Sequence, residues 1–356
     1  MRICILTHGG NFFGRHYAQA FKDRGQDVHM FLLTPVQHEL PDVPIQVFAP
    51  PGLDPNTESR SWYLKTVLPV RRAVRKLRPD IVFAMYLSSA GVVGALSGCR
   101  GLVLSARGSD VVQHVASRAW RGVFRWMTRR AAMVHAVSDP LAGMLRDLVG
   151  VPDRKLFVCP IGVDTEQLAY VPPSARPNAG RIICTRAHKP IYDQPTLIRA
   201  LCKLRDRGVD FHVTFGSAAK AETTKSLLAD SRMGERVTFL GGYCPAELPE
   251  LLAGADVYVS SSLADGTSSS LLEAMSTGLF PIVSDIPANR PWVTHGHNGL
   301  LFPAGNADAL ADQLSKALAE PGLRAAAAPR NRQIILEKGD KQALMDKLLE
   351  AIEKCL

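Results

Sequence analysis

The stretch from Arg2 to Thr34, RICILTHGGNFFGRHYAQAFKDRGQDVHMFLLT, decides the fold. It begins with a short apolar run, Arg2–Thr7, which is followed by the pair Gly9-Gly10. Aromatic and small residues then recur at helical spacing, and a second apolar run covers Val28–Leu33. A strand, a glycine loop, a helix and a second strand form one βαβ unit, so we expect a parallel sheet.

The same alternation continues along the chain. Further strand-like runs lie at 80–86, 101–106, 133–138, 156–160, 181–186, 211–216, 236–241, 256–261 and 280–285, and segments with helical periodicity separate them. The proline-rich stretch Tyr170–Gly180 interrupts the series and predicts a linker. The sequence therefore predicts an α/β protein with two Rossmann-like doubly wound domains facing across a cleft, residues 1–170 and 171–339, followed by a last helix at about 340–356.

The composition is that of a packed globular protein. Of 356 residues, 46% are hydrophobic and 21% are charged, and a chain of this length is too long for one ordinary core. The seven cysteines are scattered and form no C-x-x-C pair, which argues against a disulfide framework and a zinc knuckle. The first apolar run is too short for a signal peptide, and no stretch approaches 18 apolar residues. We expect a cytoplasmic protein, either free or peripheral on the inner face of the membrane.

Positive charge is concentrated in the first half. Residues 1–170 hold 21 Lys/Arg and 13 Asp/Glu, whereas the remainder holds 21 and 20. The segment 117–130 predicts a helix with arginines on one stripe, and Trp120, Val123, Phe124 and Met127 on roughly the opposite one. Either the apolar stripe is core and the arginines are solvated, or the basic domain rests on an anionic membrane surface. Nucleic acid is the weaker alternative, and we expect none.

The segment 265–278, DGTSSSLLEAMSTG, joins a loop to a helix. Thr267 or Ser268 can cap this helix, and Gly278 ends it. Small side chains leave room for a ligand beside the first-turn amides, which suit a diphosphate. Glu273 lies about one turn further on, where it can accept hydrogen bonds from vicinal hydroxyls. The two acids, Asp265 and Glu273, can thus address two ends of one extended ligand. The alternative is a capped surface helix with an exposed glutamate.

Other motifs are weaker. Gly9-Gly10 permits close approach of a ligand to the backbone, but it matches neither G-x-G-x-x-G nor a P-loop, and a plain tight turn explains it equally well. No Ser, Cys or His arrangement suggests a nucleophilic triad, and no zinc-ligand spacing occurs. We expect His135, in VHAVSD, to be a packed strand residue.

The segment 255–313, ADVYVSS…LADGTSSSLLEAMSTG…HNGLLFPAGNADALADQ, resembles the signature region of the family 4 glycosyltransferases of GT-B fold. RGSD (107–110), AVSDPLAGML (136–145) and PIGVDTEQL (160–168) occur in the order usual for that family, so the resemblance spans nearly the whole chain. It implies transfer of a sugar from a nucleotide-sugar with retention at the anomeric carbon, without a required metal or other cofactor. It also implies that the last helix packs back on the first domain.

The resemblance assigns roles to particular residues. It implies that Asp265 contacts the donor sugar, that Glu273 contacts the ribose, and that Arg186 neutralises the diphosphate. The first acid is usually Glu, so Asp265 is a departure. The family's lysine falls at Ile191, which leaves Lys189 as the nearest candidate. The donor-binding set is completed by a group of glycines and small polar residues and one tyrosine that lines the base pocket: Gly9, Gly10, Gly266, Thr267, Ser268, Ser269, Ser270 and Tyr243.

A second departure concerns Arg107, which stands before Gly-Ser-Asp where many relatives have histidine. An arginine cannot act as a base at neutral pH, but it can hold an anionic acceptor or a phosphate. Asp110 either pairs with Arg107 for structural reasons or lies with it on the acceptor side.

The sequence therefore predicts a retaining hexosyltransferase that uses a nucleotide-sugar donor and a glycan, lipid-linked or small-molecule acceptor. A catalytically silent sugar-nucleotide-binding partner protein remains an alternative, because of the departures at Asp265 and Arg107 and the missing lysine. A sugar-nucleotide epimerase is a third hypothesis, and it needs an acid/base set that the sequence does not supply.

Overall fold

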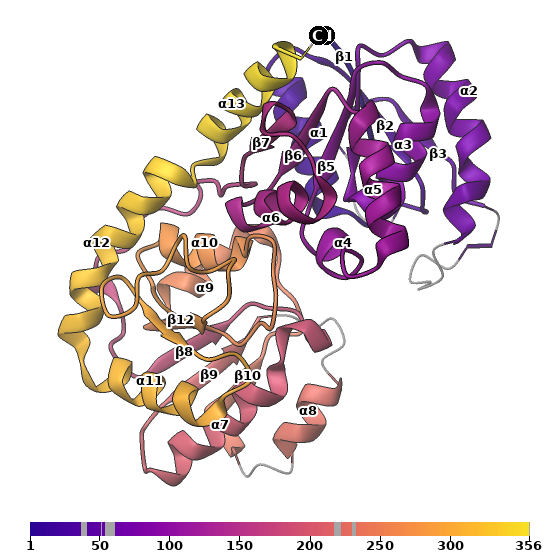
Figure 1. Ribbon diagram of the computed structural model, residues 1–356. Coiled ribbons are helices and arrows are strands. Elements are labelled where there is room, and N and C mark those ends of the chain that lie inside the picture. The colour runs from indigo at the N-terminus through magenta and orange to yellow at the C-terminus, as the bar shows by residue number, and fades with distance from the viewer. Residues whose placement is uncertain (37–40, 51, 54–60, 217–221, 230–232, 356) are drawn as a thin grey trace. The chain divides into compact units, whose positions relative to one another are not determined.

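The computed structural model describes residues 1–36, 41–50, 52–53, 61–216, 222–229 and 233–355. The chain forms two compact units (Figure 1). The first consists of Met1–Ile161 together with Gln342–Leu356, and the second of Gly162–Lys341.

The first unit is built on a seven-stranded sheet in the order β3-β2-β1-β4-β5-β6-β7, with every pairing parallel. Its strands are β1 (Arg2–Thr7), β2 (Asp27–Leu32), β3 (Ile45–Val47), β4 (Ile81–Met85), β5 (Leu102–Ala106), β6 (Met133–Ala136) and β7 (Leu156–Val158). The chain runs outward from β1 to β3 on one side and then from β4 to β7 on the other. The topological switch point therefore lies between β1 and β4.

Helices cover both faces of this sheet. They are α1 (Phe12–Asp23), α2 (Val67–Leu77), α3 (Val92–Ser97), α4 (Ser109–Val112), α5 (Arg118–Arg130), α6 (Asp139–Met144) and α13 (Lys341–Glu353). Ile3 and Ile5 point to the face covered by α1 and α13. Cys4 and Leu6 point to the opposite face, with α2, α3, α5 and α6. Successive residues of β1 are buried on opposite faces because side chains alternate along a strand, which explains why the run is continuously apolar.

The second unit repeats this plan with six parallel strands in the order β10-β9-β8-β11-β12-β13. The strands are β8 (Arg181–Cys184), β9 (His212–Phe215), β10 (Val237–Phe239), β11 (Val257–Ser260), β12 (Phe280–Ser284) and β13 (Leu300–Phe302). The helices are α7 (Gln194–Asp206), α8 (Glu222–Ala229), α9 (Leu248–Ala253), α10 (Ser269–Ser276), α11 (Ala307–Ala319) and α12 (Pro321–Lys338). One core lies between the sheet and α7, α8 and α11, and the other between the sheet and α9, α10 and α12. The switch point here lies between β8 and β11.

The division between the units falls at 161/162 and 341/342, whereas the sequence placed the first boundary after 170. The stretch Tyr170–Gly180, predicted as a linker, lies in the second unit. Val171 N donates to Thr277 O, and the Arg176 guanidinium donates to the carbonyls of Leu252, Ala255 and Thr277. These hydrogen bonds fix the irregular segment to the second unit. The linker prediction rested on the number of prolines, which carries no information about such bonds. The last helix belongs to the first unit from Gln342 onward.

Several elements were not predicted from the sequence, namely β3, β13, α3, α4 and α12. The longest of these is α12, with 18 residues that include AAAA at 325–328 and Pro329. Its apolar residues follow no clear helical stripe, because it touches both cores of the second unit: Ala327 lies in one and Ile335 in the other. A search for one buried face therefore misses it.

In α5, the predicted core stripe is only partly buried. Phe124 and Met127 are fully buried, whereas Val123 is 37% exposed and Trp120 is half-buried. Val123 does not fit the core alternative, because α3 and the helical turn Leu145–Val149, which pack against α5, cover only part of the helix surface. Within the described residues, no helix combines the length and apolarity needed to cross a membrane.

Candidate functional site

The candidate site lies at the switch point of the second unit. Arg186 follows β8 by two residues, and the loop after β11 runs to Asp265 and into α10. In an open parallel sheet, loops after neighbouring strands separate at the switch point and leave room for a ligand at the carboxyl ends. The topology therefore brings together segments that are far apart in sequence. Arg186, for example, donates to Asp265, which lies 79 positions further along the chain.

The beginning of α10 is fixed by Ser268. Its backbone is extended, and its Oγ accepts a hydrogen bond from Leu271 N at 3.3 Å, so the choice between Thr267 and Ser268 is settled for Ser268. At the other end, Gly278 has φ of 78°, as predicted for the residue that ends the helix. Cap and stop define a helix of eight residues whose first turn points toward Arg186.

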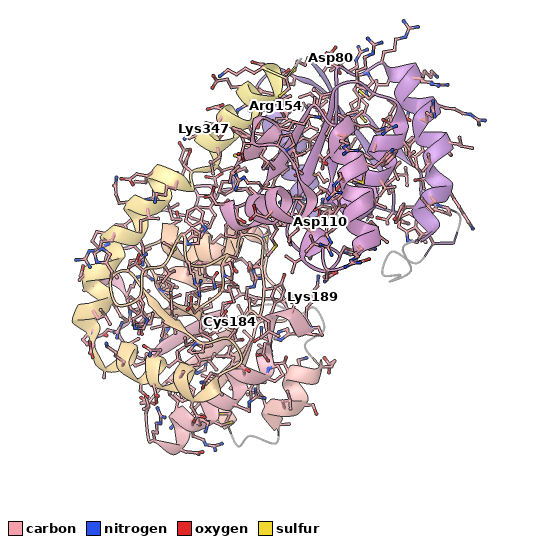
Figure 2. All side chains as sticks on the ribbon, viewed as in Figure 1. Asp80, Asp110, Arg154, Cys184, Lys189 and Lys347 are labelled. Atoms are coloured by element: carbon pink, nitrogen blue, oxygen red, sulfur yellow. The ribbon has the colours of Figure 1, made fainter. Side chains whose placement is uncertain are left out.

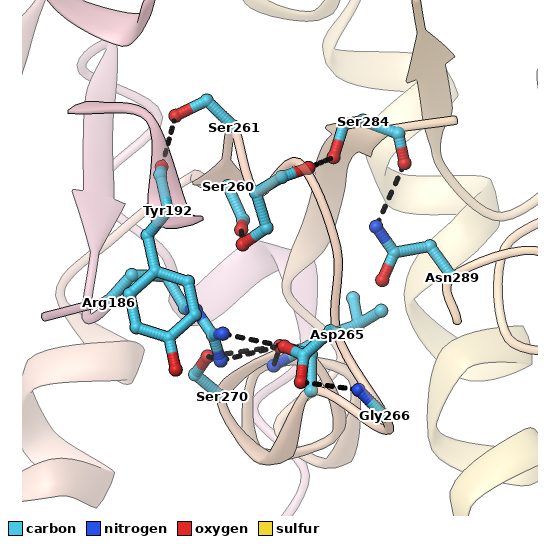
Figure 3. A network of polar contacts seen from close by, with 12 residues as sticks. Arg186, Tyr192, Ser260, Ser261, Asp265, Gly266, Ser270, Ser284 and Asn289 are labelled. Atoms are coloured by element: carbon cyan, nitrogen blue, oxygen red, sulfur yellow. Dashed lines mark hydrogen bonds and ion pairs between the residues drawn. The ribbon is translucent and has the colours of Figure 1, made fainter. Parts of the chain in front are cut away.

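Arg186 is the centre of a polar network (Figure 3). Its Nη2 lies 2.6 Å from Asp265 Oδ2, and its Nη1 donates to Ser268 Oγ at 3.1 Å and Ser270 Oγ at 3.2 Å. The guanidinium carbon lies 3.8 Å from the centre of the Tyr192 ring. Burial alone disfavours the charged form, but the Asp265 carboxylate outweighs it, and the pKa of Arg186 is raised. Arg186 is thus a permanent cation held beside the amino end of a helix.

A layer of hydroxyls supports this network from the carboxyl ends of the strands. Tyr258 Oη lies 2.8 Å from Ser270 Oγ, and Ser260 Oγ lies 3.0 Å from Ser262 Oγ. Ser284 Oγ donates to the Ser262 carbonyl, and Asn289 Nδ2 donates to the Ser284 carbonyl at 2.9 Å (Figure 3). Because every link is to a buried strand end, the loop that carries Asp265 has little freedom.

Glu273 is a half-buried carboxyl on the second turn of α10. Desolvation raises its pKa to about 7, and the Arg186 charge opposes that rise. Burial is the main cause of the raised pKa of Tyr243, and the negative charge of Glu273 is the next. Glu273 and Tyr243 are therefore close in space. A carboxyl that titrates near neutrality can act as a hydrogen-bond acceptor or donor according to pH.

The structure brings together Arg186, Asp265, Gly266, Ser268 and Ser270, and it places Glu273 and Tyr243 near them. It also changes one expectation. Asp265 does not project alone from the loop: one oxygen is bound to Arg186 and the other accepts from Gly266 N at 2.8 Å. The two acids are therefore not equivalent, since among the described residues Asp265 has a cationic partner in contact and Glu273 has none. The sequence contained no sign of this pairing, because it depends on the switch-point geometry.

The remaining predicted residues of the donor set lie nearby along the chain. Thr267 and Ser269 flank the cap residue Ser268, Thr267 buried and Ser269 half-buried. Lys189 is exposed and precedes a 3-10 turn over 190–192 (Figure 2). Its carbonyl accepts a hydrogen bond from Tyr192 N at 2.9 Å, whereas its ammonium group has no hydrogen bond or ion pair among residues with described positions. Tyr192, which sequence reasoning missed, provides the surface against Arg186; an aromatic residue six positions after the arginine was the available signal.

Gly9 and Gly10 lie at the switch point of the first unit, directly after β1. Gly9 N donates to Thr34 Oγ1 at 2.7 Å, and a Cβ on Gly9 would lie 2.1 Å from the Pro35 carbonyl oxygen. Close packing against the segment after β2 thus accounts for this glycine without any ligand. The same switch point holds a residue that the sequence did not indicate, His8, whose Nε2 lies 2.8 Å from Ser89 Oγ.

Arg107 and Asp110 follow β5 and are both buried. Asp110 lies at the carboxyl end of the sheet, opposite to Asp80 at the amino end (Figure 2). The side-chain pair between Arg107 and Asp110, one of the two alternatives, is not formed in the described structure. Asp110 instead accepts from the backbone N–H groups of Leu87, Arg107 and Gly108, at 2.6–3.0 Å. Asp110 thus holds the loop that follows β5, and the Arg107 guanidinium points away from it.

His135 is a packed strand residue, as expected. It is fully buried in β6, its Nε2 donates to the Cys159 carbonyl at 2.7 Å, and its Nδ1 accepts from Ser105 Oγ at 2.9 Å. Burial, and next the Arg107 charge, lower its pKa to about 3, so the ring is neutral at physiological pH.

A cavity of about 440 Å³ lies at the amino ends of β11 and β12, away from the switch point, and Arg176 and Arg324 line it. Arg176 donates to carbonyls after α9 and α10, and Arg324 to carbonyls at the end of α11. These bonds satisfy carbonyls at the ends of helices, although Arg176 Nε is buried without a partner among the described residues. The cavity lies at the amino ends of the strands, whereas ligands of such sheets bind at the carboxyl ends, so it is not the candidate site.

The arrangement at the second switch point can bind an anion and orient a polyol. A buried permanent cation and the amino end of a helix favour a diphosphate, and Glu273 can bind neighbouring hydroxyls. In the described ranges, no group of three or more His, Cys, Asp or Glu could hold a metal ion.

Comparison with known proteins places relatives of this chain among the glycosyltransferases. Two family models match: "Glycosyltransferase Family 4" over residues 9–167, and "Glycosyl transferases group 1" over residues 179–334. A putative colanic acid biosynthesis glycosyltransferase, WcaL of Salmonella typhimurium, is 26% identical over 248 residues, which is 66% of this chain and 61% of that protein. A GDP-mannose-dependent alpha-(1-6)-phosphatidylinositol monomannoside mannosyltransferase of Mycobacterium tuberculosis is 26% identical over 274 residues, 72% of this chain and 70% of that protein.

Solved structures show the same fold at low sequence identity. Sucrose-phosphate synthase from Thermosynechococcus elongatus superposes with a TM-score of 0.84 and 19% identity, covering 99% of this chain and 98% of that one. Anabaena HepE in complex with UDP and glucose gives a TM-score of 0.79 and 19% identity, covering 99% and 100%.

Proposed function

This chain belongs to the glycosyltransferases of GT-B fold, and from that premise we propose that it transfers a hexosyl unit from a nucleotide-sugar to a glycan, lipid-linked or small-molecule acceptor. We further propose that the configuration at the anomeric carbon is retained and that no metal is required. The observation that carries the proposal is the buried, permanently charged Arg186 beside the amino end of α10.

In this proposal the donor diphosphate lies over the first turn of α10. Arg186 and the helix amides stabilise the charge that develops on the leaving diphosphate as its bond to the anomeric carbon breaks. Glu273 accepts hydrogen bonds from the ribose hydroxyls, Tyr243 lines the base pocket, and Asp265 contacts the donor sugar through its free lone pairs. The acceptor oxygen bonds to the anomeric carbon on the same face, and its proton passes to the leaving phosphate oxygen.

A panel of nucleotide-sugars tests the site. UDP-glucose, UDP-N-acetylglucosamine, GDP-mannose and ADP-glucose are added separately, and the melting temperature is measured. A ligand that binds only the folded state at about 100 times its Kd adds about 2.7 kcal/mol of stability. We expect a shift with the true donor, and we expect Arg186→Ala and Glu273→Ala to abolish it.

Arg205→Ala and Glu250→Ala are the matched controls, because both residues belong to the same unit and lie outside the network. They should retain the shift. Unchanged shifts in both Arg186→Ala and Glu273→Ala would refute the site assignment.

A catalytically silent sugar-nucleotide-binding protein is the second candidate. It is favoured by the position of Lys189, which is exposed and contributes no second cation to Arg186 within the described structure. Donor binding without hydrolysis or transfer, across neutral, anionic and lipid-linked acceptors, would favour this candidate over the enzyme.

We also propose that the first unit rests on an anionic membrane surface. Leu64, just before α2, and Leu68, in its first turn, are 54% and 64% exposed. Four exposed basic residues follow on the same helix, Arg71, Arg72, Arg75 and Lys76. Exposed leucines next to cations suit the boundary between acyl chains and anionic headgroups.

Co-sedimentation with vesicles tests the membrane proposal. We expect binding to vesicles of phosphatidylcholine with phosphatidylglycerol, and little to phosphatidylcholine alone. The double variant Leu64→Ser/Leu68→Ser should weaken binding at constant charge, whereas Leu336→Ser, exposed on α12, should not. Equal recovery with both vesicle types would contradict the proposal.

A further inference from the structure

The first unit contains a buried guanidinium, that of Arg107, that pairs with no carboxylate among the described residues. Arg107 is 8% exposed, and its guanidinium carbon lies 4.8 Å from the centre of the Phe13 ring and 5.4 Å from that of Tyr17. Nη1 donates to Tyr17 Oη at 2.9 Å, whereas Nη2 is buried and has no hydrogen-bond partner in the part of the chain that the structure describes. A buried guanidinium with an unmet donor is costly unless something else compensates for it.

Asp110, the carboxyl nearest in sequence, does not supply this compensation. Its two oxygens are bound to three backbone N–H groups, and burial raises its pKa, which weakens it further as a counter-charge. No ion pair to Arg107 occurs among the described residues, although pairs such as Arg186–Asp265 do. The two aromatic rings stabilise the cation in part, but they accept no hydrogen bond from Nη2.

Two neutral side chains, Tyr17 and His135, lie near the Arg107 guanidinium. Tyr17 adds a hydrogen-bond donor, and neither side chain adds a charge. Burial raises the pKa of Tyr17, so its phenol is neutral; it accepts from Arg107 and keeps its own proton for donation. His135 is neutral as well, and both of its ring nitrogens are already bonded. A cation with a spare N–H next to a spare O–H is suited to an oxyanion.

We infer that Arg107, with Tyr17, is a specificity-determining site that binds a carboxylate or phosphate carried by a sugar substrate. This inference rests on the proposed glycosyl transfer and specifies its substrate class. Arg107 follows β5, on the carboxyl side of the sheet, where ligands of doubly wound folds bind. Nη2 is covered in the present conformation. Phe13 is half-buried and Tyr17 only 1% exposed, so Phe13 is the side chain that moves to admit the anion.

The anionic group can belong to the donor or to the acceptor, and matched pairs distinguish them. The donor arm compares UDP-glucose with UDP-glucuronate and GDP-mannose with GDP-mannuronate. The acceptor arm compares methyl glucoside with methyl glucuronide and with glucose 6-phosphate. Dissociation constants are measured by calorimetry on the full chain. We expect the anionic member of at least one pair to bind about tenfold more tightly or better, as a charge-assisted hydrogen bond provides.

Arg107→Met retains the length of the side chain without its charge and should reduce that preference to less than about threefold. Arg107→Lys should leave an intermediate preference, since one donor and the charge remain. Arg129→Met, which removes an exposed arginine from α5 of the same unit, is the control and should leave the preference unchanged. If Arg107→Met does not fold, Tyr17→Phe removes the phenolic donor while keeping the ring, and should also lower the preference.

Equal affinity within every pair for the wild-type protein overturns the inference, and so does a preference that survives in Arg107→Met. The proposed function fails in a different way, through loss of Arg186-dependent binding of every nucleotide-sugar. Arg186-dependent binding without any charge preference would therefore reject the role of Arg107 and leave glycosyl transfer intact.

Discussion

Glu273 illustrates how one side chain links stability to binding. Its pKa of about 7 means that, between pH 4.5 and 7, the folded protein holds a proton that the unfolded chain has released. The free energy of unfolding therefore falls as pH rises through this window. A carboxyl whose ionised form is destabilising at neutral pH is a candidate for a ligand-binding group.

Glu273→Gln should remove this dependence. We expect the variant to be more stable than wild type at pH 8, on the order of 2 kcal/mol because the side chain is only half-buried, and to show little advantage at pH 4.5. Urea denaturation at both pH values measures the difference. Glu250→Gln, at an exposed position of α9, is the control. An advantage of the same size at both pH values would show that the cause is packing and not titration.

At the scale of elements, α10 depends on its two ends. Ser268 binds the first turn, and Gly278 turns the chain back toward β12. Gly278 has two separate reasons to be glycine. Its φ is 78°, and a Cβ would lie 2.6 Å from Cε2 of Tyr170, which packs against it.

Gly278→Ala should therefore cost more than backbone strain alone. Gly305 offers a matched control, because its φ is 77° and no atom lies within 4 Å of the position that a Cβ would occupy. We expect Gly305→Ala to cost about 1 kcal/mol and Gly278→Ala about 2–4 kcal/mol, the excess coming from displacement of the Tyr170 ring. Chemical denaturation of both variants tests this. Equal losses would mean that the ring moves away freely.

At the scale of the whole molecule, the C-terminal helix completes the unit formed by the N-terminus. Leu344, Met345, Leu348 and Ile352 of α13 are buried in the same core as Ile3 of β1. The first unit therefore joins residues that are far apart in sequence, and this core is incomplete without α13.

Leu348→Ala should destabilise the first unit by about 2–5 kcal/mol, because the side chain is fully buried. Leu336→Ala, 45% exposed on α12, should change stability by less than about 0.5 kcal/mol. Hydrogen exchange followed by mass spectrometry locates the effect. Faster exchange in β1 and α1, with the second unit unaffected, is the expected pattern, and uniform acceleration would contradict it.

The sequence by itself determined the two parallel sheets and the approximate place of most strands, because strands buried on both faces must be continuously apolar and helices between them must be periodic. It also indicated α10, with its cap and its terminal glycine, since these depend on neighbouring residues alone. Only the tertiary structure decided that Arg186 pairs with Asp265, that Tyr192 lies against it, and that Arg107 turns away from Asp110. The contacts of Arg186 with Asp265 and of Arg107 with Tyr17 join residues brought together by strand order, which leaves no local pattern in the chain. Tyr192 and Asp110 are close in sequence to Arg186 and Arg107, but the direction of their side chains depends on tertiary packing.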